Sequence, residues 1–387
     1  MPFSARQGFF FQGGVTPPPA NDTIWYGITG SDWSNTASGL TGGTVSLDTS
    51  ATVTYFTAPL ASRSAVLHPN GNIYCAPRSS GQGMLEYDPV NGVSTLLQYG
   101  ALANTLGANS TSNAFFHSAC LTESGNILCV PFSYTKIIQV DPVAGTATEF
   151  GTFSGTAKWS GGVLGQNGNV YFIPQNYNGV LEVDPVTETT TTHTYGLTMS
   201  GGTKWWGGYR SPKDDRIYCA PLLNGAVLVI APDGQTASRE TFGLTFNTSP
   251  NQHYGATGDM YGNVVLVRGD GPNTKVINPD SNTGYTVSTN VSFGGVTGAD
   301  GNVYTISKNS AMQKIDLSSG NATPTVTPAL SDNPNKMAAT TALNNKTYVF
   351  HDGGDSEVFI FDTSGNAANL TNGANTILSP YFKTSKI

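Results

Sequence analysis

One unit of short strands recurs about seven times along this chain of 387 residues, and this repetition limits the folds that it can adopt. In the copy at residues 159–185, a first apolar strand ends at the Asn-Gly-Asn of residues 167–169, a second strand ends at Pro174, and a third closes on Asp-Pro. The same order appears at residues 64–89 and 120–142. A period of roughly 40 to 50 residues built from short strands is typical of a β-propeller, each repeat being one four-stranded blade. The repeat therefore predicts an all-β propeller.

The number of copies of each strand predicts the number of blades. The third strand recurs eight times, because residues 44–56 already have the pattern of a strand pair. The first two strands recur seven times, with the second strand at Ile73, Ile127, Val170, Ile217, Val264, Val303 and Thr347. We therefore predict seven blades, with eight as the alternative. If the N-terminal strand pair completes a blade begun near residues 376–382, both chain ends close the ring and no sheet edge stays exposed.

The turn residues of the repeat each have a physical reason. Asn-Gly between the first two strands favours the positive φ values of a type I′ turn. Proline ends the second strand because it cannot donate a ladder hydrogen bond. The recurring aspartates at the end of the third strand are expected to accept backbone hydrogen bonds there. Cys75, Cys129 and Cys219 share one repeat position in different blades, so they predict buried apolar packing rather than disulfides, and we expect the same of Cys120.

Composition excludes some partners. Only 11% of residues are charged, and the formal net charge is -7. A nucleic-acid surface needs clustered Lys and Arg, which this chain lacks, so no nucleic-acid partner is expected. No stretch reaches membrane-spanning length, so no membrane insertion is expected either. Residues 1–22 lack a charged start followed by a long apolar run, which predicts synthesis in the cytoplasm without a secretion signal.

The chain divides into three parts: residues 1–22, an irregular N-terminal arm; residues 23–60, a linker and strand pair that joins the propeller; and residues 61–387, the propeller. The arm combines aromatic residues with Gly-Gly and Pro-Pro-Pro, a composition that forms neither strand nor helix. We expect it to dock on a partner protein through Phe3, Phe9, Phe10 and Phe11. The alternative is that the arm folds back onto its own propeller.

One group of side chains precedes the first strand of successive repeats, roughly nine to twelve residues before the Asn of each turn. Its members are Arg63, His117, Lys158, Trp159, Lys204, Trp205, Trp206, His253 and Tyr254. In a propeller, the loop entering the innermost strand lies at the mouth of the central channel, so these residues are expected to converge on one face. Aromatic planes stack on sugar faces and cations bind acidic groups, so the group predicts a site for carbohydrate or anionic ligands. The alternative is that the tryptophans wedge between blades and the cations only extend toward solvent.

The N-terminal segment, Met-Pro-Phe-Ser-Ala-Arg-Gln-Gly-Phe-Phe, leads through Gly and Pro into a body rich in Thr, Ser, Asn and Gly. This opening resembles tail and appendage proteins of marine bacteriophages. The resemblance implies a virion structural protein that is made in the host cytoplasm and assembled in multiple copies. Its partners would be other virion proteins, reached through the arm, and host-surface carbohydrate.

The repeat itself, with Asn-Gly-x-Ile-Tyr and the Asp-Pro of the third strand, resembles the propellers of the streptogramin B lyase and related YVTN-type superfamily. That lyase family uses a metal-assisted His and Glu site on one propeller face. The histidines here are His68, His117, His193, His253 and His351, and no pair with a nearby Glu recurs at the expected place. We therefore predict a binding protein without catalytic residues, metal or cofactor. The alternatives are a metal-dependent lyase and a glycan-binding propeller independent of a virion.

Overall fold

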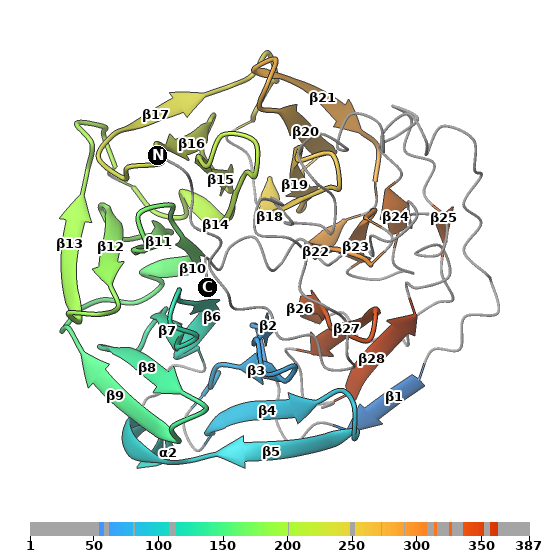
Figure 1. Ribbon diagram of the computed structural model, residues 1–387. Helices are drawn as coiled ribbons and strands as arrows, with labels where there is room; N and C mark the ends of the chain where they lie inside the picture. The colour runs from blue at the N-terminus through green and yellow to red at the C-terminus, as the bar shows by residue number, and fades with distance from the viewer. Residues whose placement is uncertain are drawn as a thin grey trace, which may run out of the picture.

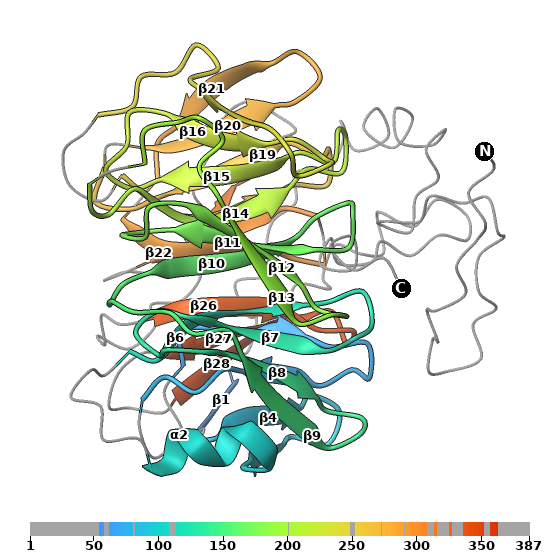
Figure 2. The ribbon, with the colours of Figure 1, turned by 90° about the vertical axis from the view of Figure 1, so that its left-hand side faces the viewer.

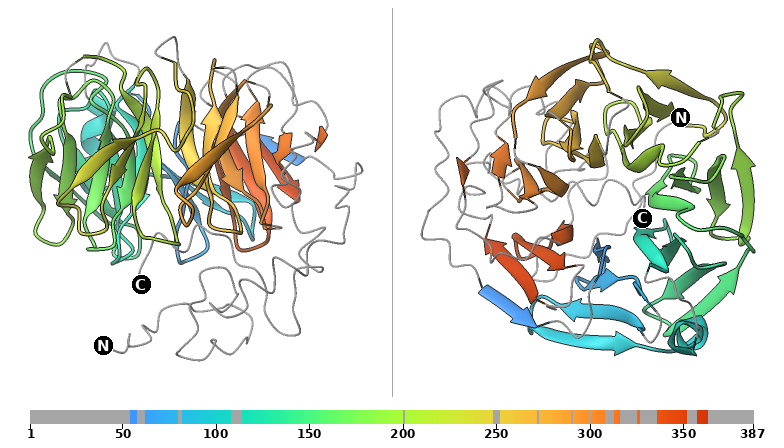
Figure 3. Two further views of the ribbon diagram at one scale, coloured as in Figure 1. Left: turned by 90° about the horizontal axis from the view of Figure 1, so that it is seen from above. Right: turned by 180° about the vertical axis from the view of Figure 1, so that it is seen from behind.

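The computed structural model describes residues 54–57, 62–79, 82–107, 114–199, 201–247, 252–271, 273–289, 291–299, 301–307, 313–315, 325–326, 336–351 and 357–362. These residues form seven four-stranded antiparallel sheets that surround a central axis (Figure 1). Seen from the side, the sheets pack face to face around the ring (Figure 2), and the view from behind shows the same circular order (Figure 3). The prediction of an all-β propeller is confirmed.

Six of the seven sheets consist of four strands that are consecutive in the chain. From the innermost strand outward, the first three are β2 (Val66–Leu67), β3 (Ile73–Cys75), β4 (Met84–Asp88) and β5 (Val93–Leu97); β6 (Phe116–Leu121), β7 (Ile127–Pro131), β8 (Ile137–Asp141) and β9 (Thr146–Phe150); and β10 (Trp159–Leu164), β11 (Val170–Pro174), β12 (Val180–Asp184) and β13 (Thr189–His193). The next three are β14 (Trp205–Arg210), β15 (Ile217–Pro221), β16 (Val227–Ile230) and β17 (Ala237–Glu240); β18 (His253–Gly258), β19 (Val264–Arg268), β20 (Thr274–Asn278) and β21 (Thr283–Val287); and β22 (Ser292–Thr297), β23 (Val303–Ser307), β24 (Gln313–Ile315) and β25 (Thr325–Val326). Helix is confined, in the described ranges, to the 3-10 turn η1 (Gly100–Ala103) and α2 (Asn104–Gly107).

The seventh sheet combines strands from distant parts of the chain. Its order is β1 (Thr54–Thr57), β28 (Glu357–Asp362), β27 (Lys346–His351) and β26 (Lys336–Thr341). Thr54 lies opposite Ile360, and Thr57 lies opposite Glu357. The chain thus closes the ring by adding an N-terminal strand to a C-terminal sheet, as predicted for mixed chain ends. Only residues 54–57 of this segment are described, and the rest of the strand pair predicted over residues 44–56 lies outside the described residues. The partner strand is β28, whereas the predicted partner near residues 376–382 lies outside the described residues. This pairing covers the outer edge of β28.

The Asn-Gly turns differ from the type I′ prediction. In the turn after β2, the amide of Gly71 donates to the carbonyl of His68 and that of His68 donates to Asn72, at 2.9 Å each. Only the glycine takes positive φ (92° at Gly71), while Asn70 does not. The loop is therefore longer than two residues, with glycine alone in the left-handed conformation. The Oδ1 of Asn70 accepts from the amide of Asn72 at 2.9 Å, which explains why Asn precedes the glycine.

The other turn predictions are confirmed. Oδ1 of Asp88 accepts from the amide of Val90 at 2.8 Å, and Asp141 and Asp184 make the equivalent bonds. Pro131, Pro174 and Pro221 are the last residues of β7, β11 and β15. All four cysteines are free and buried.

The same turns also anchor a partly buried carboxylate network. Asn167 donates to the hydroxyl of Tyr171 at 2.8 Å, and that hydroxyl donates to Oε1 of Glu182 at 2.9 Å. Asn169 donates to the same oxygen at 2.7 Å, and His193 contacts Oε2 at 2.6 Å. Burial opposes the charged form of Glu182, but these hydrogen bonds outweigh it and hold the pKa of the carboxyl below its ordinary value. The network ties three neighbouring strands of one blade together.

The hydrophobic core lies between blades rather than within one. A single cluster joins Leu128 and Val130 of β7 to Trp159 and Phe172 of the next sheet. Trp159 and Trp205 are fully buried, and their indole nitrogens donate to the carbonyls of Gly179 and Ala226 at 3.3 and 3.0 Å. Each blade therefore depends on its neighbours for burial. In the part of the chain that the structure describes, no helix is long and apolar enough to cross a membrane.

Candidate binding site at the mouth of the central channel

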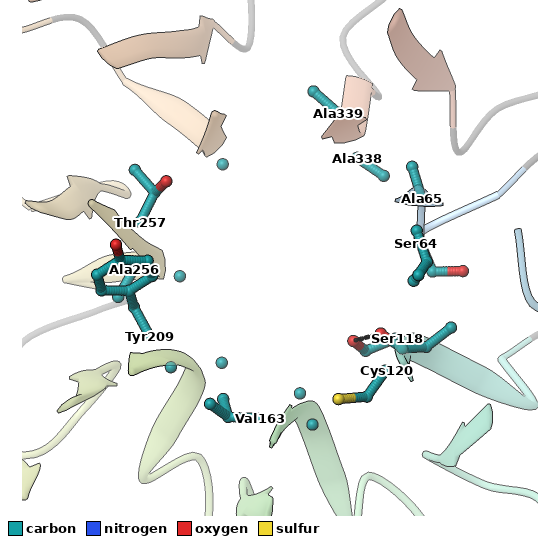
Figure 4. Close-up of a pocket in the computed structure, with 18 of the residues that line it drawn as sticks. Ser64, Ala65, Ser118, Cys120, Val163, Tyr209, Ala256, Thr257, Ala338 and Ala339 are labelled. Atoms are coloured by element: carbon teal, nitrogen blue, oxygen red, sulfur yellow. Dashed lines mark hydrogen bonds between the residues drawn. The ribbon is translucent and has the colours of Figure 1, made fainter. Parts of the chain in front are cut away.

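The innermost strands β2, β6, β10, β14, β18, β22 and β26 surround a channel with a cavity of about 240 Å³. Small residues form much of its wall, because two successive Gly, Ala or Ser residues occupy the same repeat position in six inner strands and just before β2. These pairs are Ser64-Ala65, Ser118-Ala119, Gly161-Gly162, Gly207-Gly208, Gly255-Ala256, Gly294-Gly295 and Ala338-Ala339. Figure 4 shows Ser64, Ala65 and Ser118 across an open centre from Ala256 and Thr257. The small pairs keep the axis open.

A β-bulge lies at the start of the inner strands. In β10, Trp159 pairs with Pro174 and Gly161 pairs with Ile173, so Ser160 is the extra residue. The register shifts at the equivalent place in β6, β14, β18, β22 and β26. A bulge turns one extra side chain away from the regular alternation of a strand. It therefore decides which of two adjacent residues reaches the channel.

The residue before the bulge packs between blades, and the residue that follows it, at the bulge itself, lines the channel. The buried residues, with at most 1% of their surface exposed, are Phe116, Trp159, Trp205, His253 and Ser292. The channel-lining residues that follow them are His117, Ser160, Trp206, Tyr254 and Phe293. Gly207 and Gly255, which come next in two of these strands, take positive φ of 62° and 101°. The bulge in these strands thus uses a conformation that glycine adopts readily.

Four of the channel-lining side chains form a continuous series of ring contacts. The ring centroids of His117 and Trp206 are 5.3 Å apart, as are those of Trp206 and Tyr254 and those of Tyr254 and Phe293. On the other side of His117, the ring of Phe132 stacks against the imidazole with 3.3 Å between centroids. Trp206 reaches His117 across β10, where Ser160 carries no ring. The series gives the mouth an aromatic wall contributed by four blades.

The cationic part of the mouth lies on the first two blades. Nη1 of Arg63 donates a hydrogen bond to Nε2 of His117, which is 5% exposed. Burial, with the nearby charges of Arg63 and Arg78, holds the pKa of His117 well below its ordinary value. A neutral imidazole can accept the guanidinium hydrogen bond, so His117 helps to orient Arg63. On the other side of the mouth, the hydroxyl of Tyr254 donates a hydrogen bond to Oδ2 of Asp270 at 3.5 Å.

The structure divides the predicted group of nine residues. Arg63, His117, Trp206 and Tyr254 meet at the channel, whereas Lys158, Trp159, Lys204, Trp205 and His253 do not line it. The expectation that all nine converge was wrong for these five, and the alternative of tryptophans wedged between blades holds for Trp159 and Trp205. The sequence reasoning missed Phe293 and Ser160. The signal that could have found them is the pair of small residues that follows each channel-lining position.

The two lysines and His253 have structural partners. The amine of Lys158 donates to the carbonyl of Gly155 at 2.9 Å, and that of Lys204 donates to Gly201 at 2.7 Å. Burial lowers the pKa of each amine to about 8. His253 is fully buried, with its ring edge-on to Phe246; burial and the charge of Lys275 lower its pKa to about 3. These groups hold the loops around the mouth.

Two further predictions concern residues away from this site. The docking candidates Phe3, Phe9, Phe10 and Phe11 lie outside the described residues. Within the described ranges, no group of three or more His, Cys, Asp or Glu side chains is placed to hold a metal ion.

No protein-family model and no curated protein matches this sequence. Solved structures do match. A streptogramin B lyase shares 11% identity with a TM-score of 0.64, over 80% of this chain and 96% of its own. A catalytically inactive virginiamycin B lyase from Staphylococcus aureus with quinupristin shares 10% with a TM-score of 0.65, over 80% and 99%. The extracellular domain of a hybrid two-component system from B. thetaiotaomicron shares 10% with a TM-score of 0.59, over 85% and 46%. This chain therefore has the propeller fold of these proteins, and identity this low shows the fold alone.

Proposed function

We propose that this chain is a non-enzymatic virion component, in a tail or surface appendage, that contacts host-surface carbohydrate at the mouth of its channel. The observation that carries the binding role is the series of ring contacts from His117 through Trp206 and Tyr254 to Phe293. Aromatic rings beside a concave cavity, with a few polar groups among them, suit a ligand that has both apolar faces and hydroxyl groups. Sugars have this chemistry.

Binding rather than turnover fits the groups at the mouth. Neutral His117 accepts a hydrogen bond from Arg63 at its ring edge, and one face of its ring is stacked on Phe132. The hydroxyl of Ser160 donates to the carbonyl of Trp205 at 3.1 Å. The other side chains at the bulge positions, Trp206, Tyr254 and Phe293, offer flat surfaces and one phenol. Burial first, and the charge of Asp270 second, raise the pKa of the Tyr254 hydroxyl to about 12, so this phenol stays protonated at neutral pH. Stacking and hydrogen bonding are what such a set supplies.

The direction of the strands supports docking of the protein on its partner through the propeller face opposite the mouth. Inner strands run away from the mouth, so β28, two strands further on, also runs away from it and ends at Asp362 near the opposite face. Thr54 begins β1 toward that same face, because β1 is antiparallel to β28. Thr54 and Asp362, at the ends of β1 and β28, therefore both lie on the side away from the aromatic wall. This placement favours a docking partner on that side, which would leave the mouth exposed.

The carbohydrate role is tested on a glycan array with the full-length protein and two variants. Trp206→Ala removes the central ring, and we expect it to lose glycan binding, while Trp206→Phe keeps a ring and retains a substantial part of it. Unchanged binding by Trp206→Ala, or no glycan binding by the wild-type protein, would contradict a carbohydrate site at the mouth. Circular dichroism of each variant checks that the propeller remains folded.

The virion role is tested separately, by following incorporation into particles. Deletion of residues 1–20, and a variant with alanine at Phe9, Phe10 and Phe11, are expected to abolish incorporation while the propeller stays folded. Incorporation at the wild-type level in both variants would refute docking through the arm. The alternative of a metal-dependent lyase is tested by metal analysis of the purified protein and by incubating wild-type and His117→Asn protein with a bound glycan. A lyase would contain metal and convert the glycan, and the variant would lose that conversion; we expect the glycan to remain intact with both proteins.

A further inference from the structure

The shape of the cavity limits how a carbohydrate can enter it. The channel runs along the axis of the ring, and strands of all seven blades enclose it. Its cavity of about 240 Å³ is smaller than the roughly 300–1,000 Å³ of pockets that take drug-sized ligands. The middle of a polymer could occupy an enclosed axial channel only by threading through it, whereas a chain end can enter directly. The cavity therefore fits one terminal unit.

The two sides of the mouth differ in chemistry. Arg63 and His117 belong to the first two blades, while Trp206, Tyr254 and Phe293 come from the fourth, fifth and sixth. A ligand at the centre would have a guanidinium on one side and ring faces on the other. Arg63 therefore carries a charge opposite in sign to the formal net charge of -7 of the whole chain, while the carboxylate of Asp270 lies beside Tyr254 on the other side. A planar guanidinium matches the geometry of a carboxylate.

From this geometry, and resting on the proposed carbohydrate function, we infer that the channel binds the terminal unit of an acidic glycan end-on. The carboxylate of the sugar contacts Arg63, and the sugar ring lies against Trp206 and Tyr254. His117 is a positioning residue, because it accepts a hydrogen bond from Arg63 and is itself held by stacking on Phe132. The small residues below the mouth leave room for the terminal unit.

The test uses three synthetic oligosaccharides of equal length, titrated calorimetrically into the full-length protein. The first ends in a hexuronic acid at its non-reducing end, the second carries the same acid internally, and the third is neutral. One charge-assisted hydrogen-bonded contact corresponds to roughly tenfold in affinity, so we expect the terminal acid to bind about tenfold or more tightly than the other two. Equal affinity for terminal and internal acids would overturn end-on binding.

Variants separate this inference from the function on which it rests. Arg63→Gln is expected to remove the preference, so that within this variant the terminal acid and the neutral sugar bind with equal affinity. Arg239→Gln, an exposed arginine that lies over Trp205 away from the channel, is the matched control and should keep the tenfold preference. His117→Asn should reduce the preference, because it removes the imidazole that orients Arg63.

Failure of the acidic specificity and failure of the proposed function would give different results. If Arg63→Gln keeps the preference, or if the three sugars bind equally to the wild-type protein, the acidic specificity is wrong while the carbohydrate site stands. If none of the three binds and Trp206→Ala behaves as wild type on the glycan array, the proposed function itself fails.

Discussion

The bulge in β14 predicts that two adjacent tryptophans have very different effects on stability. Trp205 is fully buried between blades, and its indole nitrogen donates to the carbonyl of Ala226. A buried tryptophan removes about 200 Å² from water, which at about 25 cal/mol/Å² corresponds to about 5 kcal/mol. The lost hydrogen bond adds about 1 kcal/mol, whereas residual burial in the unfolded chain reduces the total. We expect Trp205→Ala to lower the free energy of unfolding by about 4 kcal/mol.

Trp206 should behave differently because the bulge turns it into the channel. Its ring is half-buried and contacts other rings at the mouth rather than the core between blades. We expect Trp206→Ala to lower the free energy of unfolding by about 1 kcal/mol, and to abolish ligand binding instead. The pair is its own control, since both variants remove the same side chain from neighbouring positions.

The measurement is guanidinium unfolding at 25 °C followed by far-ultraviolet circular dichroism, which reports mainly the backbone and can therefore follow both variants. The difference between the two variants should be about 3 kcal/mol, well above the error of extrapolation. Equal destabilisation, or a larger effect at Trp206, would refute the register of β14 and with it the placement of the channel-lining residues. If the free energy of unfolding falls with guanidinium concentration at the same slope in both variants, the two expose similar surface on unfolding.

Three other perturbations test the physical account. Glu182→Gln should destabilise the protein most near pH 7, because the folded-state pKa of Glu182 lies below its ordinary value of 4.5; the difference from wild type, measured by urea unfolding across pH, should vanish as pH falls through that folded-state pKa. Asp259 should give the opposite trend, because burial raises its pKa from 3.8 to about 6. Its contribution to the free energy of unfolding should be greatest below pH 3.8 and should be lost as pH rises through about 6. Asp259→Asn should abolish this pH dependence in the same titration. Gly161→Ala should lower the unfolding free energy by about 2 kcal/mol, because its Cβ would lie 2.6 Å from the Cα of Gly207 on the next blade; a neutral effect in thermal unfolding would show that the inner strands can separate.

The turn chemistry of the repeat made the fold predictable. Asn-Gly, the strand-ending prolines and the recurring Asp mark the same places in successive blades, and the structure has turns or strand ends at each. The pairing of an N-terminal strand with the last sheet also followed from counting strands. The partner of that strand was not predictable in this way, because β28 has an ordinary third-strand sequence and its edge position depends on the closed ring.

The candidate site was predictable only in part, because a bulge cannot be read from hydrophobic periodicity. Trp205 and Trp206 have the same side chain, and nothing in the local pattern says which one faces the core. The shift of one residue moves every following side chain to the other face. Lys158 illustrates a second limit. A lysine before an inner strand suggested a cation at the mouth, whereas its amine is held by the carbonyl of Gly155, a contact that depends on the conformation of a loop.

The internal repeats separate what the fold requires from what it leaves open. Before the bulge, four of the five buried residues are aromatic, and after the channel-lining position each blade has two small residues. Between them, the six channel-lining residues at the mouth are Arg63, His117, Ser160, Trp206, Tyr254 and Phe293, and no two are alike. If packing alone determined this position, seven equivalent environments would favour similar side chains. The fold tolerates a cation, an imidazole, a hydroxyl and three different rings there, so packing does not dictate which side chain stands at this position. The proposed ligand, which meets a cation on one side and rings on the other, would account for their order around the axis.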